Sequence, residues 1–460
     1  MNNNSVRSVA FLSLGCKVNA YETESIEESF KKAGYNIKSF DEPADVYVIN
    51  TCTVTNIADR KSRQMLHRAK KMNPGAVVVA VGCYVQAPQS ELEEDSLVDI
   101  LVGNRGKGEV LNLVEMYLDS GRRLDLKHNV IKSGEENDNW AYEEQEVDEA
   151  GGHTRANIKI QDGCNQFCSY CIIPYVRGRI RSRNEDDIIN EVRSLSEKGY
   201  KEMVLTGIHI GSFGLDVDGK SHMEELLKKI EEVPGDFRVR LGSVEPRLIS
   251  ESFVKTVAES HKICPHFHMS LQSGCDTVLK RMNRHYTTAE FERSVDLLRT
   301  YLDRPGITTD IITGFPGETE EEFEETVAFT EKIGFLKVHT FPYSRRAGTY
   351  ADRMPGQLTE QVKKEREKRL ITVADAAAER YISSFAGDSE RVLPEEKMKD
   401  RDDLIIGHSD RYIEVAVPVA ELAAAETDGL KDFVRVTGLE SSGSSKKSLK
   451  HVMIGHILAK

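Results

Sequence analysis

Six short apolar segments, each followed by a stretch of helical character, recur along the middle of the chain and constrain its fold more than any other feature. The candidate strands are 156–163, 202–207, 237–244, 266–272, 307–314 and 336–344. Helical segments separate them, at 185–198, 221–232, 288–302 and 319–333. Such alternation gives parallel strands joined by helical crossovers. Six units predict a (βα)6 barrel or an open partial barrel, whose functional face is the carboxyl end of its strands.

A second, shorter alternation occupies the start of the chain. Its apolar segments are 9–15, 46–51, 76–82 and 99–104, and its clearest helical segments are 21–34 and 56–75. This pattern predicts an N-terminal doubly wound parallel α/β domain over residues 5–118. We expect an acidic linker at 119–149, because the segment lacks periodicity and residues 135–149 hold eight acids and no base.

The end of the chain follows a third pattern. Residues 359–385 predict one long helix with Thr359 as its N-cap. Short alternating β segments follow, at 412–419, 433–439 and 451–458. They predict a small β-barrel over 383–457, which leaves 150–382 for the central barrel domain. The chain as a whole is therefore expected to belong to the α/β class.

Three of the eight cysteines lie in "DGCNQFCSYCIIP" (162–174), directly after the first strand of the six-unit series. Cys164, Cys168 and Cys171 have the spacing C-x3-C-x2-C, and we call them the loop triad. Structural zinc takes four ligands, and ferredoxin clusters take four thiolates. Three thiols could instead hold an iron–sulfur cluster that leaves one iron open to a small molecule. Cys264 and Cys275 stand alone and are expected to be small buried hydrophobes.

Three further cysteines follow three consecutive strands of the N-terminal domain. Cys16 comes after the first predicted strand, Cys52 closes the second and Cys83 follows the third. All three, which we call the N-terminal triad, would emerge at the carboxyl edge of one parallel sheet, where open α/β sheets bind ligands. Unrelated core thiols would not be expected at three equivalent positions, so a shared metal or cluster site is favoured.

The loop triad, placed after the first strand of a (βα)6 series, resembles that of the radical S-adenosylmethionine (SAM) enzymes. Nearly the whole chain is similar to the methylthiotransferases that modify tRNA, which join a domain with three dispersed cysteines, a radical-SAM barrel and a C-terminal TRAM domain. The matching motifs include "SLGCKVNAYETE" (13–24), "NTCTVTNIADRKSRQ" (50–64), "SVEP" (243–246), "SLQSG" (270–274) and "DIITGFPGET" (310–319). The first two are most similar to the subgroup that acts on N6-threonylcarbamoyladenosine.

The resemblance implies an enzyme, a radical SAM transferase, that uses two SAM molecules per turnover. It implies a 4Fe–4S cluster on the loop triad, with SAM at the open iron, and an auxiliary 4Fe–4S cluster on the N-terminal triad. One SAM would methylate a sulfur associated with the auxiliary cluster. The other would give a radical that abstracts hydrogen at or near adenine C2, where the methylthio group is inserted next to the anticodon. No catalytic side chain is assigned.

The strand-end motifs predict where SAM binds. The expected contacts are Glu245, Ser243, Gly207, Gln272 and Gly314. Glu245 suits the ribose hydroxyls, the alternative being a turn carboxylate set by Pro246. Gly314 lacks a Cβ and would let the backbone approach SAM. His266 and His268 share one strand face, where we expect satisfied histidines, with His268 lining the cavity.

A net charge of -13 argues against a general nucleic-acid binder, but two basic clusters stand out, at 60–71 and 177–183. The candidate RNA contacts are Arg60, Lys61, Arg63, Arg68, Arg177 and Arg181. The alternatives are a solvated helix face and an exposed polar strand. The resemblance implies tRNA and an electron donor such as a flavodoxin or ferredoxin as partners, and leaves the sulfur donor unassigned. No apolar run is long enough to span a membrane, so we expect a cytoplasmic protein with no membrane partner.

Two other functions remain open. The enzyme could instead act on isopentenyladenosine in tRNA or on a ribosomal protein, and the motif forms at 13–24 and 50–64 argue against both. A non-enzymatic iron–sulfur or zinc scaffold would have no use for "SVEP" and "GFPGET" at strand ends. The iron and sulfide content of the protein separates an enzyme with two clusters from a zinc scaffold.

Overall fold

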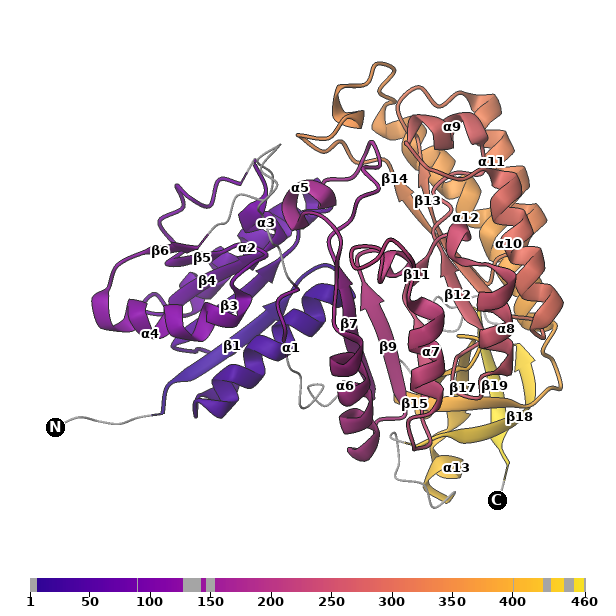
Figure 1. Ribbon diagram of the computed structural model, residues 1–460, viewed down its shortest axis with the longest axis horizontal. Coiled ribbons are helices and arrows are strands. Elements are labelled where there is room, and N and C mark those ends of the chain that lie inside the picture. Colours follow the sequence, from indigo (N-terminus) through magenta and orange to yellow (C-terminus); the bar gives the residue numbers. More distant parts are fainter. Residues whose placement is uncertain are drawn as a thin grey trace.

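The computed structural model describes residues 6–88, 90–126, 142–145, 154–399, 401–424, 432–441 and 451–458. The chain forms three bodies in sequence order: an N-terminal α/β lobe, a central open barrel and a small C-terminal β-barrel (Figure 1). The N-terminal lobe stands beside the central barrel. The C-terminal barrel lies beneath it, at the amino ends of the central strands.

The N-terminal lobe is built on a parallel sheet of six strands in the order β2-β1-β3-β4-β5-β6. The strands are β1 (Ser8–Ser13), β2 (Asn36–Lys38), β3 (Val46–Thr51), β4 (Val77–Gly82), β5 (Ile100–Val102) and β6 (Leu124–Leu126). Helices α1 (Lys17–Lys32) and α4 (Val110–Ser120) cover one face, and α2 (Asn56–Met72) covers the other. Every residue of β3 and β4 is buried, as expected for central strands covered on both faces. The predicted parallel α/β lobe is confirmed.

The boundary of this lobe differs from the predicted one. Helix α4 runs to Ser120, and β6 then pairs with β5, so the sheet continues beyond residue 118 into the expected linker. The segment was assigned to the linker because β6 has only three residues and carries Asp125 at its centre. Most of the acidic run at 135–149 lies outside the described residues.

The central barrel consists of two four-stranded sheets, in the orders β10-β9-β7-β8 and β11-β12-β13-β14. The six predicted strands are β7 (Arg155–Asp162), β9 (Glu202–Gly207), β10 (Arg238–Leu241), β12 (His266–Met269), β13 (Gly306–Thr313) and β14 (Lys337–Pro342). The predicted strand 237–244 is divided into β10 and the short strand β11 (Ser243–Val244), which belong to different sheets, and the short strand β8 (Arg181–Ser182) was not predicted. Because β8 and β14 are outer strands of their sheets, the barrel is open on one side. Helix α1 packs there against β7 and β9 (Figure 1).

Alternate residues of the barrel strands have different surroundings. The covering helices are α6 (Glu185–Glu197), α7 (Met223–Glu231), α8 (Glu251–Glu259), α10 (Thr288–Tyr301) and α11 (Glu320–Ile333). Ile158, Phe267 and Ile311 pack among these helices in the largest core cluster. The polar residues between them, such as His268 and Asp310, therefore face the interior, which we call the lumen.

Helix α12 (Glu360–Ser383) leads into a closed five-stranded barrel in the order β15-β16-β17-β19-β18. The strands are β15 (Glu390–Met398), β16 (Arg401–Ser409), β17 (Glu414–Pro418), β18 (Val434–Ser441) and β19 (Val452–Ile457). β15 and β16 are not among the strands predicted from the sequence. β15 carries Pro394 beside a register shift, and charged residues interrupt the apolar alternation of both strands.

The C-terminal barrel closes the lower end of the lumen. Arg240 donates to the carbonyl oxygens of Ser409 (3.1 Å) and Asp410 (3.0 Å). The ring of Tyr412 stacks between those of His266 and His408, at centroid distances of 4.6 and 4.4 Å. These contacts fix Tyr412 as part of the lumen floor.

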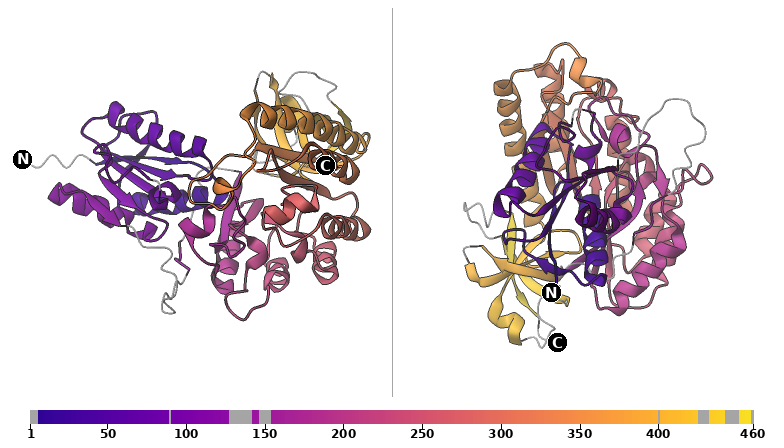
Figure 2. Two further views of the ribbon diagram at one scale, coloured as in Figure 1. Left: turned by 90° about the horizontal axis from the view of Figure 1, so that it is seen from above. Right: turned by 90° about the vertical axis from the view of Figure 1, so that its left-hand side faces the viewer.

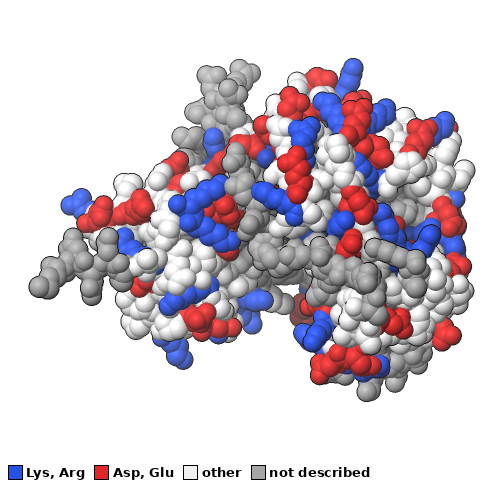
Figure 3. Space-filling model, turned by 90° about the horizontal axis from the view of Figure 1, so that it is seen from below, with Lys and Arg blue, Asp and Glu red and all other residues white. Residues whose placement is uncertain are grey.

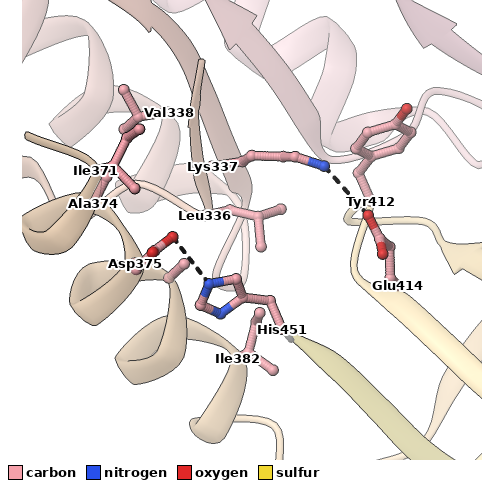
Figure 4. A pocket seen from close by; sticks show the side chains of 11 residues that line it. Leu336, Lys337, Val338, Ile371, Ala374, Asp375, Ile382, Tyr412, Glu414 and His451 are labelled. Atoms are coloured by element: carbon pink, nitrogen blue, oxygen red, sulfur yellow. Dashed lines mark hydrogen bonds and ion pairs between the residues drawn. The ribbon is translucent and has the colours of Figure 1, made fainter. Parts of the chain in front are cut away.

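A pocket of about 160 Å³ lies between α12, β14 and the C-terminal barrel (Figure 4). Two contacts cross it, a hydrogen bond between His451 and Asp375 at 3.1 Å and an ion pair between Lys337 and Glu414 at 3.3 Å. Polar contacts thus attach the C-terminal barrel on this side too. Among the described residues, no helix is long and apolar enough to cross a membrane.

Candidate active site between two cysteine triads

The loop triad follows β7 in a turn that needs glycine. Gly163 has φ +69°, and a Cβ there would lie 1.8 Å from the carbonyl oxygen of Arg179. Its N–H donates to Asp162 Oδ1 at 2.7 Å, and the N–H of Cys164 donates to the carbonyl of Gly178. Asn283 holds the far side of the loop by donating to the carbonyl of Phe167 at 3.0 Å. The backbone of the loop is therefore fixed on both sides.

Arg284 links the loop triad to the expected ribose-binding carboxylate. Its guanidinium donates to Cys168 Sγ at 3.1 Å and to Glu245 Oε1 at 2.5 Å. Burial alone would raise the pKa of Glu245, but hydrogen bonds from His209 and Arg284 outweigh it and lower the pKa to about 2. Glu245 is therefore an ionised acceptor, and Gln166 of the loop donates to its other oxygen at 3.4 Å.

The other residues expected to bind SAM also lie at carboxyl ends of barrel strands. Gly207 ends β9, Ser243 begins β11 beyond the end of β10, and Gln272 and Gly314 follow β12 and β13. Gln272 has φ +67°, an uncommon conformation that two backbone hydrogen bonds to β13 maintain. Backbone held in such a conformation is frequent at ligand sites.

Gly314 is held by a buried ion pair. Its N–H donates to Glu318 Oε2 at 2.8 Å, and the same oxygen accepts from Arg366 of α12 at 2.7 Å. A Cβ at Gly314 would lie 2.5 Å from Lys363 Cγ. Helix α12 therefore fixes the "GFPGET" turn and explains why glycine is needed there.

The three sulfurs of the N-terminal triad also converge. Cys16 is the N-cap of α1, Cys52 follows β3 and Cys83 begins the short helix α3 (Cys83–Gln86). Burial raises the pKa of Cys52 to about 12, and the neighbouring thiols Cys83 and Cys16 add to this rise. Cys16 is exposed whereas the other two are buried, so the group opens on the side of Cys16.

Arg177 connects the two triads. It ends helix α5 (Ile173–Arg177), donates from Nε to Cys83 Sγ at 3.3 Å and from Nη1 to Glu22 and Asp162, each at 3.0 Å. Asp162 in turn receives the N–H of Gly163 at the start of the loop triad. One buried guanidinium thus joins the N-terminal lobe to the base of the cluster loop.

The prediction that Arg177 and Arg181 contact RNA is wrong. Arg177 is 1% exposed and Arg181 6% exposed. Segment 177–183 forms the end of α5 and the short strand β8, not a strand with one exposed face. Both side chains are turned inward because the carboxylate of Asp162 lies beneath them, with contacts at 3.0 and 3.5 Å.

The geometry fits iron–sulfur clusters better than single metal ions. Among the described residues, the group whose ligand atoms all lie within 4.8 Å of one another is His268, Asp310 and His339, and neither cysteine triad is that compact. A single zinc ion, with Zn–S bonds of about 2.3 Å, would need its thiolates closer together.

The buried charges beside Cys83 support the same assignment. Lys107, Lys159 and Arg177 surround only two carboxylates, Glu22 and Asp162. Arg177 Nε donates to Cys83 Sγ, so the excess positive charge lies next to this sulfur. Thiolates bound to iron would supply the missing negative charge.

The other basic cluster lies on α2 and remains accessible. Arg60, Lys61 and Arg68 are exposed, although Arg68 pairs with Asp41 at 2.7 Å. Arg63 is half-buried and donates to the hydroxyl of Tyr84 at 2.6 Å. Arg60 and Lys61 are therefore the candidates with the freest side chains.

Two arginines that could not be identified from the sequence, Arg284 and Arg346, contact residues far away in the chain. Arg284 had no signal, because a lone arginine after a short helix is common. Arg346 donates to Asp59 of α2 at 3.1 Å, and Asn56 donates to the carbonyl of Arg345 at 2.9 Å. The loop after β14 therefore reaches the N-terminal lobe, as Figure 2 shows from above.

Comparison with family models divides the chain as the structure does. Residues 158–330 match the radical SAM superfamily, and residues 8–103 match uncharacterized protein family UPF0004. These ranges correspond to the central barrel and the N-terminal lobe.

Curated relatives cover most of the chain. A threonylcarbamoyladenosine tRNA methylthiotransferase MtaB of Bacillus subtilis is 42% identical, with 89% of this chain and 90% of that protein covered. The protein of the same name in Thermotoga maritima is 38% identical, with 85% and 87% covered. A tRNA-2-methylthio-N(6)-dimethylallyladenosine synthase of Carboxydothermus hydrogenoformans is 34% identical, with 88% and 91% covered.

A solved structure shares the arrangement of lobe and barrel at low sequence identity. The radical SAM methyltransferase TsrM of Kitasatospora setae, solved with cobalamin and a 4Fe–4S cluster bound, has a TM-score of 0.54 and 14% identity. The match covers 76% of this chain and 74% of that one. At this identity the similarity concerns the fold alone.

Proposed function

We propose the function of the chain from one premise: it belongs to the radical SAM methylthiotransferases that modify tRNA. It is an enzyme of the radical SAM transferase type. Its reaction converts N6-threonylcarbamoyladenosine in tRNA, next to the anticodon, into the 2-methylthio derivative. The observation that carries this proposal is the pair of contacts made by Arg177, which donates to Cys83 of the N-terminal triad and to Asp162 at the base of the loop that holds the other triad.

The cofactors are two 4Fe–4S clusters and SAM, of which two molecules are used per turnover. When bound, the clusters supply the electron that cleaves SAM and the sulfur that enters the base. We assign one cluster to Cys164, Cys168 and Cys171 and the auxiliary one to Cys16, Cys52 and Cys83. The exposed position of Cys16 opens the auxiliary site toward the substrate, while Cys52 and Cys83 are shielded from solvent.

The protein's own groups orient SAM. We assign the ribose hydroxyls to Glu245, because Arg284 and His209 hold its carboxylate ionised and in place. The neighbouring strand ends at Gly207, Ser243, Gln272 and Gly314 complete the proposed SAM site. A SAM molecule bound there would lie beside the loop triad, whose cluster would supply the electron for its cleavage.

We assign RNA docking mainly to the upper surface around α2. Arg60 and Lys61 offer positive charge there, and the exposed side chains of Ile57 and Tyr350 offer apolar surface for bases. On the face seen from below, Lys and Arg are interspersed with Asp and Glu, without one large basic field (Figure 3). We identify the C-terminal barrel as a TRAM domain with a secondary part in RNA binding.

The proposed reaction also defines its other partners. Reduction of the loop-triad cluster requires a one-electron donor such as a flavodoxin or ferredoxin. Because the substrate is a tRNA, we expect the enzyme to act in the cytoplasm.

The test is mass spectrometry of tRNA nucleosides from cells that lack the protein. The expected result is loss of the 2-methylthio group from N6-threonylcarbamoyladenosine, with restoration by the intact chain. The relative named for dimethylallyladenosine represents the competing substrate. Loss of the methylthio group from that nucleoside alone would refute the proposed substrate.

A further inference from the structure

Polar side chains line the lumen below the proposed SAM site, and several of them are hydrogen-bonded to one another. Thr308 Oγ1 contacts His266 Nε2 at 3.1 Å and His268 Nδ1 at 3.0 Å. His268 Nε2 lies 3.3 Å from Asp310. His268 therefore has a partner for each ring nitrogen and lines the cavity, as expected from the sequence. The buried Nδ1 of His266 has no hydrogen-bond partner in the described part of the chain, so the expectation of a satisfied histidine is not met there.

Lys17 enters this lumen from the N-terminal lobe. It is the first residue of α1, directly after Cys16, and α1 packs against β7 and β9. Its side chain is exposed, and the charged groups that act on it are Arg155, Arg240 and Glu202 of the lumen. An exposed side chain with these surroundings lies on the wall of an open cavity.

The other cations around the lumen already have anionic partners. Arg155 and Arg240 both pair with Glu202, at 3.2 and 3.0 Å. Lys337 is turned toward Glu414 of the C-terminal barrel (Figure 4). Lys17, in contrast, forms no ion pair with any carboxylate in the described part of the chain. It is the cation of the lumen that a ligand could neutralise.

The substrate carries a matching group. The threonylcarbamoyl substituent on adenine N6 ends in a carboxylate, whereas an isopentenyl substituent is an uncharged hydrocarbon. The substituent is carried on C6, and C6 and C2 flank N1 on one edge of the ring, so a base with C2 near Cys16 brings the substituent close to the residue that follows Cys16. An ammonium with no anionic partner, held beside two fixed guanidiniums, attracts an anion rather than a hydrocarbon.

We propose that Lys17 binds the threonyl carboxylate of the substrate and thereby selects N6-threonylcarbamoyladenosine over uncharged N6-substituted adenosines. This inference rests on the proposed function.

The first test uses the holoenzyme without any substitution. Its Kd is measured by fluorescence anisotropy for an anticodon stem-loop RNA carrying N6-threonylcarbamoyladenosine and for the same RNA with the carboxylate converted to its methyl ester. Loss of one charge-assisted contact is expected to weaken binding of the ester about ten- to a hundredfold. Equal affinity for acid and ester would overturn the inference.

Substitutions then assign the effect to Lys17. Lys17→Met should bind acid and ester equally, and Lys17→Arg should keep the preference for the acid. Lys228→Met, on the exposed face of α7, is the matched control and should behave as the unsubstituted enzyme. Iron content is measured for each variant, because Lys17 adjoins Cys16. A Lys17→Met variant that holds both clusters and still prefers the acid would show that another residue binds the carboxylate.

Different results would refute the proposed function and the proposed role of Lys17. If the unsubstituted enzyme does not methylthiolate the acid RNA, the proposed function is wrong. If it does so while binding acid and ester equally, only the role of Lys17 is wrong.

Discussion

Arg177 and Arg284 occupy corresponding positions in the two triads. Arg177 places Nε 3.3 Å from Cys83 Sγ, and Arg284 places Nη1 3.1 Å from Cys168 Sγ. Each guanidinium also holds a buried carboxylate. Hydrogen bonds to sulfurs that bind a cluster, and the carboxylates that hold the donors of these bonds in place, tune the cluster potential and the orientation of the ligands. At the residue scale, each of these two arginines links one thiol of a triad to a buried carboxylate.

Replacing Arg284 should affect SAM more than the protein. Arg284→Gln leaves Glu245 with fewer donors and removes the contact to Cys168, so we expect SAM affinity to fall about tenfold or more. The measurement is the Kd for SAM, with 5′-deoxyadenosine formation as a second readout. Arg281→Gln is the control, since Arg281 pairs with Glu322 instead. Unchanged SAM affinity in Arg284→Gln would refute the assignment.

Replacing Arg177 should affect the auxiliary site and the attachment of the N-terminal lobe. Arg177→Gln removes a positive charge from the buried carboxylates of Glu22 and Asp162. Removing one partner of a buried ion pair lowers the free energy of unfolding by about 3–5 kcal/mol. We expect a lower thermal midpoint and loss of iron from the N-terminal triad first. The exposed Arg179→Gln is the control, and iron loss from that variant as large as from Arg177→Gln would contradict the prediction.

At the element scale, the sequence predicted the buried strands well and the interfaces poorly. β3 and β4 are short buried runs, and barrel strands such as β7 and β12 alternate apolar with polar residues. Both signals depend on local burial alone. β15 and β16 were missed because their charged residues and Pro394 conceal the alternation. The partners of Arg177 come from α1 and from β7, so no local pattern could show that this arginine is buried.

Helix α1 makes a pH-dependent contribution to stability. Burial raises the pKa of Glu24 to about 7, with further contributions from Glu27 and Glu191. A carboxyl whose folded pKa is raised favours the folded state most below its unfolded pKa of about 4.3, and this contribution is lost as pH rises through about 7. Glu24→Gln should therefore raise the thermal midpoint at pH 8 but not at pH 5.

The stabilisation expected for Glu24→Gln can be compared with the effect of a substitution elsewhere on the same helix. After allowance for solvent screening we expect Glu24→Gln to stabilise by about 1 kcal/mol at pH 8. Glu28→Gln, on the same helix beside Lys32, is the control. The measurement is thermal unfolding followed by circular dichroism at both pH values, and equal stabilisation at both would contradict the raised pKa.

On the scale of the whole molecule, two lobes each bring a cysteine triad to one shared region. The sequence predicted the convergence of Cys16, Cys52 and Cys83, because these cysteines follow three parallel strands. It could not predict how the N-terminal lobe meets the barrel, because that depends on Arg177, Arg346 and the packing of α1 in the open side of the barrel. The placement of Lys17 in the lumen is a consequence of the same packing.

The most direct test of two cooperating cluster sites is the iron and sulfide content of the anaerobically reconstituted protein and of two triple variants. The intact chain should bind about eight irons and eight sulfides, as two 4Fe–4S clusters. Replacing Cys16, Cys52 and Cys83 by Ala should leave about four irons and SAM cleavage without methylthiolation. Replacing Cys164, Cys168 and Cys171 should leave about four irons and no cleavage. About four irons in the intact chain, or zinc in place of iron, would contradict the two-cluster site.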